Sequence, residues 1–131
     1  MRPTVAFGII ALIVPLVSAF TIPRKIKDVK PVYPPESLQL GDEGAFIIEL
    51  SVDASGTVQQ ATILWSGCQR LEKAVLAAVR QWRYEQSLQN GKPTPFKVVS
   101  NVPLRLPPQF QSRAGQSGAC KWKEPPKPLA D

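Results

Sequence analysis

One amphipathic helix in an otherwise strand-rich sequence is the feature that most constrains how this chain folds. Apolar residues recur at offsets of three and four between positions 71 and 82: Leu71, Ala74, Val75, Ala78, Val79 and Trp82. The opposite face carries Lys73, Arg80 and Arg83. Burying such a stripe contributes several kcal/mol, at about 25 cal/mol per Å² of apolar surface, so we expect the helix to lie on a sheet. Ser66 and Gln69 have the spacing of a capping box at its start.

Alternating apolar residues predict two strands joined as a hairpin. In residues 43–53 one face is apolar and consists of Phe46, Ile48, Leu50 and Val52. Residues 53–56 have the composition of a turn, because Gly56 tolerates a positive φ, and β-type residues resume over residues 57–65. The apolar parity of this second strand changes after Val58, which predicts a β-bulge near Gln59 and Gln60 and sets Ala61, Ile63 and Trp65 on one face.

A third strand is predicted after a turn at residues 89–93. Its apolar residues share one parity and are Phe96, Val98, Val102, Leu104 and Leu106. Pro103 cannot donate a ladder hydrogen bond, which places the second half of this strand at a sheet edge or beyond the pairing region. Residues 33–38 predict a short helix, because proline suits a first helical turn, and Gly41 or Gly44 would end it. These elements make an α+β fold.

The N-terminus has the pattern of a cleavable signal peptide. Arg2 precedes an apolar run over residues 5–17, and small residues follow at the end of that run, so we expect cleavage after Ala19. The alternative is a retained inner-membrane anchor, which needs about 20 apolar residues. This run is shorter and contains Pro15, and the basic residues that follow it disfavour an anchor with its C-terminal side outside.

The rest of the chain divides into a basic leader at residues 20–30, one folded domain at residues 31–107 and a Pro/Lys-rich tail at residues 108–131. We expect the tail to be disordered unless Cys120 anchors it. In an oxidising compartment Cys68 and Cys120 can form a disulfide, with two free thiols as the alternative. The distance between the cysteines in sequence and the absence of histidine argue against a metal site.

The formal net charge is +6. In an exported protein this charge favours anionic envelope surfaces over nucleic acid, although scattered basic residues also serve solubility alone. The sequence has no histidine, nucleophile elbow, metal-ligand cluster or phosphate loop. Glu43, Glu49 and Asp53 fit the pattern of solvated charges on one strand. We therefore expect neither enzymatic activity nor a cofactor.

Several short motifs follow one another along the domain. They are Pro31-x-Tyr33-Pro34, Gly44, Val52-Asp53-x-x-Gly56, Ser66-Gly67, Leu71, Trp82-Arg83-Tyr84, Gly91-x-Pro93 and Val102-Pro103-Leu104. In this order the motifs resemble the TonB C-terminal family over about residues 30–106. The resemblance implies a small antiparallel three-stranded sheet packed against one main helix, with a short N-terminal helix. It also implies a protein-binding module of the cell envelope, in the periplasm, that is linked to transmembrane transport.

Members of this family bind an extended peptide along an exposed sheet edge. Carried over by position, the partner-binding residues of this chain would be Phe96, Lys97, Val98, Val99, Ser100 and Asn101. Because unpaired N–H and C=O groups are a template for strand addition, the expected partner is an envelope-protein segment such as a receptor TonB-box peptide. Strand exchange at the same edge would make a homodimer. The alternative is that these residues only close the sheet.

A second functional hypothesis is an envelope adaptor that binds cell wall or the anionic outer-membrane surface through the basic leader and tail. The sequence also departs from the energy-transducing members of the family, which carry a retained anchor with a functional histidine and a long Pro-rich spacer. Here the leader has only about a dozen residues, which span roughly 40 Å when fully extended. We therefore do not expect this chain acting alone to transduce energy.

Overall fold

The computed structural model describes Gly8 and residues 23–127. Apart from Gly8, the predicted signal peptide at residues 1–19 lies outside the described residues. Among the helices of the described part of the chain, none is both long enough and apolar enough to cross a membrane.

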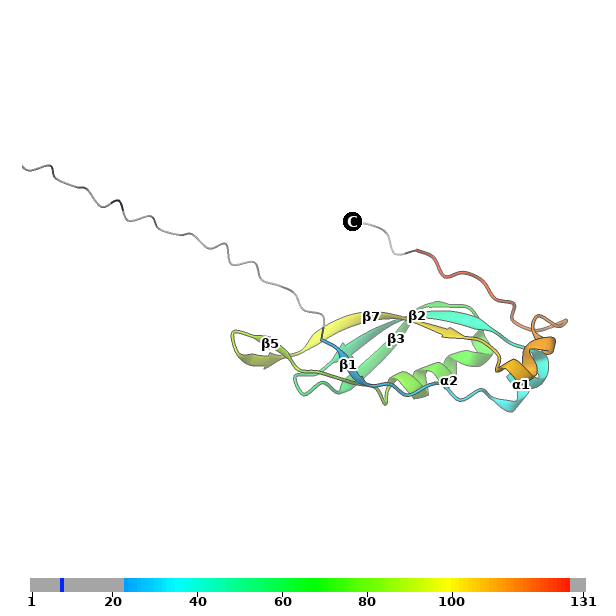
Figure 1. Ribbon diagram of the computed structural model, residues 1–131, viewed down its shortest axis with the longest axis horizontal. Coiled ribbons are helices and arrows are strands. Elements are labelled where there is room, and N and C mark those ends of the chain that lie inside the picture. The colour runs from blue at the N-terminus through cyan, green and yellow to red at the C-terminus, as the bar shows by residue number, and fades with distance from the viewer. Residues whose placement is uncertain (1–7, 9–22, 128–131) are drawn as a thin grey trace, which may run out of the picture.

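The described chain forms a three-stranded main sheet backed by one long helix, together with two small two-stranded sheets and short helices (Figure 1). In chain order these elements are β1 (Lys25–Lys27), α1 (Pro35–Leu40), β2 (Gly44–Val52), β3 (Val58–Ser66), α2 (Gln69–Val79), β4 (Arg83–Tyr84), β5 (Ser87–Gln89), β6 (Lys92–Thr94), β7 (Phe96–Leu104) and the 3₁₀ helix η1 (Pro108–Arg113).

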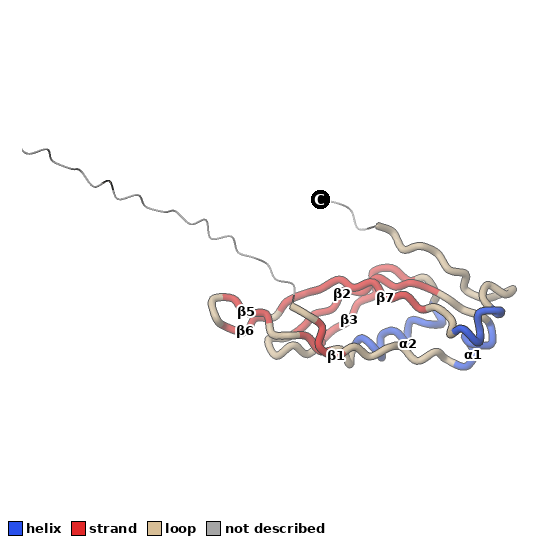
Figure 2. The backbone as a smooth tube through the Cα atoms, in the orientation of Figure 1, coloured by secondary structure: helices blue, strands red, loops and turns tan. Residues whose placement is uncertain are grey.

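The main sheet has three antiparallel strands in the order β3-β2-β7, and α2 lies across one of its faces (Figure 2). The apolar face of β2 is fully buried and consists of Phe46, Ile48, Leu50 and Val52. From α2, the core receives Leu71, Val75 and Val79. The predicted α+β class, with a main helix on a small antiparallel sheet and a short N-terminal helix, is confirmed.

The turn between β2 and β3 is fixed by a glycine and a carboxylate. Gly56 has φ 89°, and a β-carbon at this position would overlap the backbone carbonyl of Tyr84. The Asp53 carboxylate accepts hydrogen bonds from the Ser55 hydroxyl at 2.6 Å and from the Thr57 N–H at 2.9 Å. These bonds stabilise the charged form and lower the pKa of Asp53 to about 2.

β3 contains the predicted bulge and a second one that the sequence did not reveal. Its register against β2 shifts between Ser51 and Val52, where the parity of β3 predicted it, and again between Ile47 and Ile48. After the second shift Trp65 pairs with Ile47. The residues on either side of Ile47 in β2 are core residues, so Ile47 itself points to the opposite face of the sheet. Trp65 therefore lies on the outer face of the sheet, and its predicted place on the face of Ala61 and Ile63 is wrong.

α2 begins and ends differently from its sequence pattern. Cys68 is the N-cap and no side chain caps the helix, so the predicted capping box is wrong. Trp82 lies beyond the last helical residue and is 4% exposed. It still completes the apolar stripe, because the N–H of Gln81 and the N–H of Trp82 donate to the carbonyls three residues before them and tighten the last turn.

The described part of the basic leader, residues 23–30, packs on the folded body. β1 pairs with β4, and the Glu85 N–H donates to the carbonyl of Arg24 at 2.8 Å. The indole N–H of Trp82 donates to the carbonyl of Val29 at 2.9 Å. This leader segment is thus held against the end of α2, because the indole N–H and the β4 backbone supply its hydrogen-bond partners.

The C-terminal segment follows a defined path as far as residue 127. η1 contacts α1, and Cys120 is bonded to Cys68 with the two Cα atoms 5.6 Å apart. The backbone of Cys120 also bonds to the chain just before β2, since the Glu43 N–H donates to its carbonyl at 3.0 Å. The tail was predicted to be disordered unless Cys120 anchors it, and these contacts supply that anchor.

Candidate functional site

β7 presents a long, regular and open sheet edge. All nine of its residues pair with β2 in an unbroken register from Phe96 opposite Val52 to Leu104 opposite Gly44. The opposite edge strand, β3, is interrupted by its two register shifts. Bulges twist an edge and hinder further pairing, whereas a regular edge accepts another strand. In the described part of the chain, no strand covers the free side of β7.

The direction of the free hydrogen-bonding groups on β7 follows from Pro103. Its partner in register is Ala45, whose carbonyl accepts from the Gly67 N–H at 2.8 Å on the β3 side. The pair of Ala45 and Pro103 is therefore not hydrogen-bonded, and Pro103 directs its backbone away from β2. Residues of the same parity share this direction, so Val99 and Asn101 turn their N–H and C=O groups to the open edge.

Side chains along β7 alternate between the core and the outer face of the sheet. Phe96, Val98 and Ser100 are half-buried on the core side, where Phe96 packs edge-on against Tyr84 with ring centroids 5.8 Å apart. Lys97, Val99 and Asn101 are exposed. The six residues predicted as partner-binding therefore divide into three that pack against the core and three whose backbone faces the open edge. Their role in binding stays a prediction.

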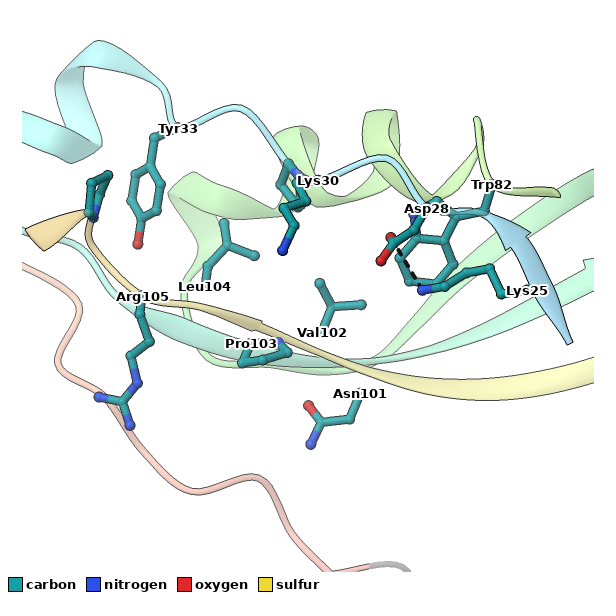
Figure 3. A pocket seen from close by; sticks show the side chains of 12 residues that line it. Lys25, Asp28, Lys30, Tyr33, Trp82, Asn101, Val102, Pro103, Leu104 and Arg105 are labelled. Carbon is teal, nitrogen blue, oxygen red and sulfur yellow. Dashed lines mark ion pairs between the residues drawn. The ribbon is translucent and has the colours of Figure 1, made fainter. Parts of the chain in front are cut away.

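A groove of about 510 Å³ runs between the C-terminal half of β7 and the N-terminal segment 25–33 (Figure 3). From β7 and the chain after it, the lining comes from Asn101, Val102, Pro103, Leu104, Arg105 and Pro107. Across the groove lie Lys25, Asp28, Lys30, Pro31, Tyr33 and Trp82. The groove is thus open to the same edge at which the free backbone groups of β7 lie.

The far wall of the groove is held by aromatic side chains. Lys25 lies 3.5 Å over the ring of Trp82 and forms an ion pair with Asp28 at 3.3 Å. The Tyr33 hydroxyl donates to the carbonyl of Asp42 at 2.8 Å. Burial, with the nearby charges of Glu43 and Asp42, raises the pKa of Tyr33 well above its usual value, so this hydroxyl stays protonated and keeps donating.

A buried carboxylate braces the end of the groove. Arg70 donates to both oxygens of Asp42, at 2.8 and 2.6 Å, and the Cys120 N–H donates to the same carboxylate at 2.8 Å. Burial alone would raise the pKa of Asp42, but these hydrogen bonds outweigh it and lower the pKa. The Asp42 carboxylate lies close to the sulfurs of Cys68 and Cys120, but the disulfide occupies both sulfurs, so this cluster does not offer a set of metal ligands.

The groove lies further along β7 than most of the residues predicted to bind a partner. Of the six predicted residues, only Asn101 lines the groove. Lys30, Arg105 and Trp82 also line the groove, although no sequence pattern marked them as site residues. Two signals were present: the run of basic residues in the leader and the proline in the last strand. Neither shows that these segments meet in space.

Comparison with known proteins places this geometry in a family. A family model described as Gram-negative bacterial TonB protein C-terminal matches residues 29–105. The chain belongs to the TonB C-terminal family. It is 36% identical over 73 residues to the Protein TonB of Yersinia enterocolitica, 30% over 79 residues to that of Vibrio cholerae serotype O1 and 34% over 93 residues to that of Klebsiella pneumoniae.

These matches cover only part of the length of each relative. They include 55%, 60% and 70% of this chain, but 29%, 32% and 36% of the respective relatives. The chain thus spans about a third of the length of the curated relatives it matches. The solution NMR structure of the Pseudomonas aeruginosa TonB CTD superposes with a TM-score of 0.55 at 20% identity, over 64% of this chain and 86% of that one. This likeness supports the fold.

Proposed function

We propose that this TonB C-terminal domain is a protein-binding module that captures an extended segment of another envelope protein by adding it to the sheet beside β7. The observation that carries the proposal is the edge itself: nine residues in unbroken register, with Pro103 turned outward. Main-chain hydrogen bonds to such an edge supply affinity, and pockets for alternate side chains supply selectivity.

The groove gives the visiting strand its selectivity. A strand that pairs with β7 continues the sheet, so every second side chain points toward the α2 face. On that face the strand meets the groove between β7 and residues 25–33, whose lining includes the largely buried apolar side chains of Val102, Leu104 and Trp82 (Figure 3). The groove therefore favours a segment that places apolar side chains on alternate positions.

The family suggests the class of partner. The relatives are named Protein TonB, and we infer that the partner of this chain is likewise a protein segment of the Gram-negative envelope, with the TonB box of an outer-membrane receptor as the first candidate. This assignment places the domain in the periplasm and links it to transmembrane transport.

A peptide titration tests the proposal. A ten-residue TonB-box peptide, blocked at both ends and fluorescently labelled, is titrated with wild-type protein and with the variants Val99→Pro and Val99→Ala. The proline variant removes an N–H that faces the open edge and leaves the ladder to β2 intact. Losing that donor and leaving a peptide carbonyl unpaired costs about 1.4 kcal/mol or more, so we expect binding at least about tenfold weaker.

The alanine variant is the matched control, because it trims the same side chain but keeps the N–H. It should bind within about threefold of wild type, and circular dichroism should show that both variants fold. Equal affinity of Val99→Pro and Val99→Ala would mean that the edge does not pair with the peptide, and would leave β7 as a strand that only closes the sheet.

A further inference from the structure

The C-terminal segment, residues 113–127, carries an excess of positive charge. It contains one acidic side chain, Glu124, and four exposed basic ones, namely Arg113, Lys121, Lys123 and Lys127. Within the described part of the chain, none of these four lies within ion-pair distance of a carboxylate. Glu124 instead accepts a hydrogen bond from the indole N–H of Trp122 at 2.9 Å. The four cations are therefore available to an anionic partner.

This segment is fixed on the side of the main sheet that faces away from α2. The disulfide joins Cys120 to Cys68, and the Glu43 N–H donates to the Cys120 carbonyl at 3.0 Å. Two residues further on, the ring of Trp122 stacks on the guanidinium of Arg105, 3.4 Å from its centroid. In Figure 3 Arg105 and the C-terminal segment lie on one side of β7, and α2 lies on the other. The basic side chains thus extend from an anchored backbone.

Apolar side chains lie on the same side of the sheet. The outer face of the sheet, opposite α2, carries Trp65 and Ile47, which are partners in register and are both half-buried. On β7 the side chain of Val99 points to this face and is 57% exposed. Figure 1 shows that the C-terminal segment leaves the body over this face, whereas α2 lies below the sheet. Cations and an aromatic side chain are therefore presented together.

We propose that this side of the domain binds the surface of a phospholipid bilayer with anionic headgroups. The four basic side chains of residues 113–127 lie against headgroup phosphates, and Trp65 lies at the level of the headgroups. Lysine and arginine are attracted by the negative potential of such a surface, and tryptophan favours the boundary between water and hydrocarbon. Stable attachment to a membrane needs two such signals, and the outer face and the C-terminal segment supply one each.

The basic leader fits this role less well than the C-terminal segment. Arg24 forms an ion pair with Glu85 at 2.9 Å, and Lys25 forms one with Asp28 at 3.3 Å. The described part of the leader also packs against the end of α2, on the other side of the sheet. A bilayer on the outer face leaves the backbone edge of β7 open, so this inference does not depend on the proposed strand addition.

Co-sedimentation with vesicles tests the inference. Wild-type protein is mixed with vesicles of phosphatidylcholine alone or of an equimolar mixture of phosphatidylcholine and phosphatidylglycerol. We expect binding to the mixed vesicles only, and weaker binding as the salt concentration rises. Each lysine near such a surface contributes about a factor of five, so Lys121→Gln/Lys123→Gln/Lys127→Gln should lower the partition coefficient about a hundredfold.

A second triple variant is the matched control. Lys73→Gln/Arg80→Gln/Arg83→Gln removes the same charge from three exposed residues in α2 and just after it. Charges farther than a Debye length from the membrane are screened, so this variant should bind within about threefold of wild type. An equal loss in both variants would mean that net charge alone decides, and would overturn the inference. Equal binding to both kinds of vesicle, or sedimentation with cell-wall sacculi but not with the mixed vesicles, would overturn it too.

Quenching by brominated lipids tests the orientation of the bound domain. Bromine on the acyl chains quenches tryptophans that reach the hydrocarbon boundary. Trp65 should be quenched, whereas Trp82, which is 4% exposed and lies on the α2 side, should not. Trp65→Phe should therefore remove much of the quenching, with Trp82→Phe as the control that does not. Quenching that is the same in wild type and in Trp65→Phe would contradict a membrane contact through the outer face.

Discussion

Opening the disulfide between Cys68 and Cys120 should lower the free energy of unfolding by about 4 kcal/mol. The two residues are 52 positions apart, and a loop of this length in the chain-entropy model contributes about 4 kcal/mol at 25 °C by restricting the unfolded chain. The folded state should change less, because Asp42 and Glu43 still hold the backbone of Cys120. For a domain of this size the loss corresponds to a fall of about 15 °C in Tm.

Urea unfolding at pH 7 measures this loss in wild type, with and without a reductant, and in a Cys68→Ala/Cys120→Ala double variant. Cys68 is a core residue, so its replacement removes some packing as well as the bond. Reduction of wild type removes the bond alone, and the double variant should not respond to reductant. The unfolding m value should rise in both cases, because an open unfolded chain exposes more surface. A loss below about 1 kcal/mol on reduction would refute the reasoning.

Further predictions concern the turn and the core, and each is checked by chemical or thermal unfolding. Gly56→Ala should destabilise the domain by about 2–3 kcal/mol, because its φ of 89° and the neighbouring backbone leave no room for a β-carbon; Gly91→Ala, with φ 76° but open surroundings, should cost only about 1 kcal/mol. The hydrogen bonds in its own turn lower the pKa of Asp53 to about 2, below its ordinary value of 3.8. Because the pKa of Asp53 is lower in the folded state than in the unfolded chain, its ionised carboxylate stabilises the fold at pH values above the unfolded pKa. This contribution should disappear as the pH falls from about 4 to 2. Asp53→Asn should abolish that part of the pH dependence, and an unchanged profile would contradict it. Leu71→Ala should cost about 3 kcal/mol, because Leu71 is fully buried, whereas Leu64→Ala, at a side chain 53% exposed, should cost less than about 1 kcal/mol. Similar losses at both leucines would contradict the assigned core.

Most of the secondary structure followed from local patterns. The alternation in β2 and the helical stripe of α2 indicated which faces are buried, and the parity change in β3 predicted the first bulge. The second bulge, opposite Ile47 and Ile48, was not visible, because Leu64 and Trp65 are both apolar and the pattern did not show which of them faces the core. The predicted capping box was also wrong, because a hydrogen-bond motif in the sequence does not fix the residue at which a helix begins.

The candidate site was less accessible to sequence analysis. Pro103 correctly indicated an edge strand, but the groove beside it depends on segments that are far apart in the chain, namely residues 25–33, Trp82 and residues 101–107. The leader lacks a periodic pattern, so its packing was not predicted. It is held by single hydrogen bonds, such as that from the Trp82 indole to the carbonyl of Val29, which no local pattern encodes.

The sequence by itself determined which residues of this chain form strands and the main helix and which of their faces are apolar, because the spacing of side chains along one element fixes what can be buried together. Only the tertiary structure decided which backbone groups of β7 remain free, since that depends on the register against β2 and on the direction of the Ala45 carbonyl. It also decided that segment 25–33 lies across a groove from this edge, because the position of one segment relative to a distant strand is set by packing.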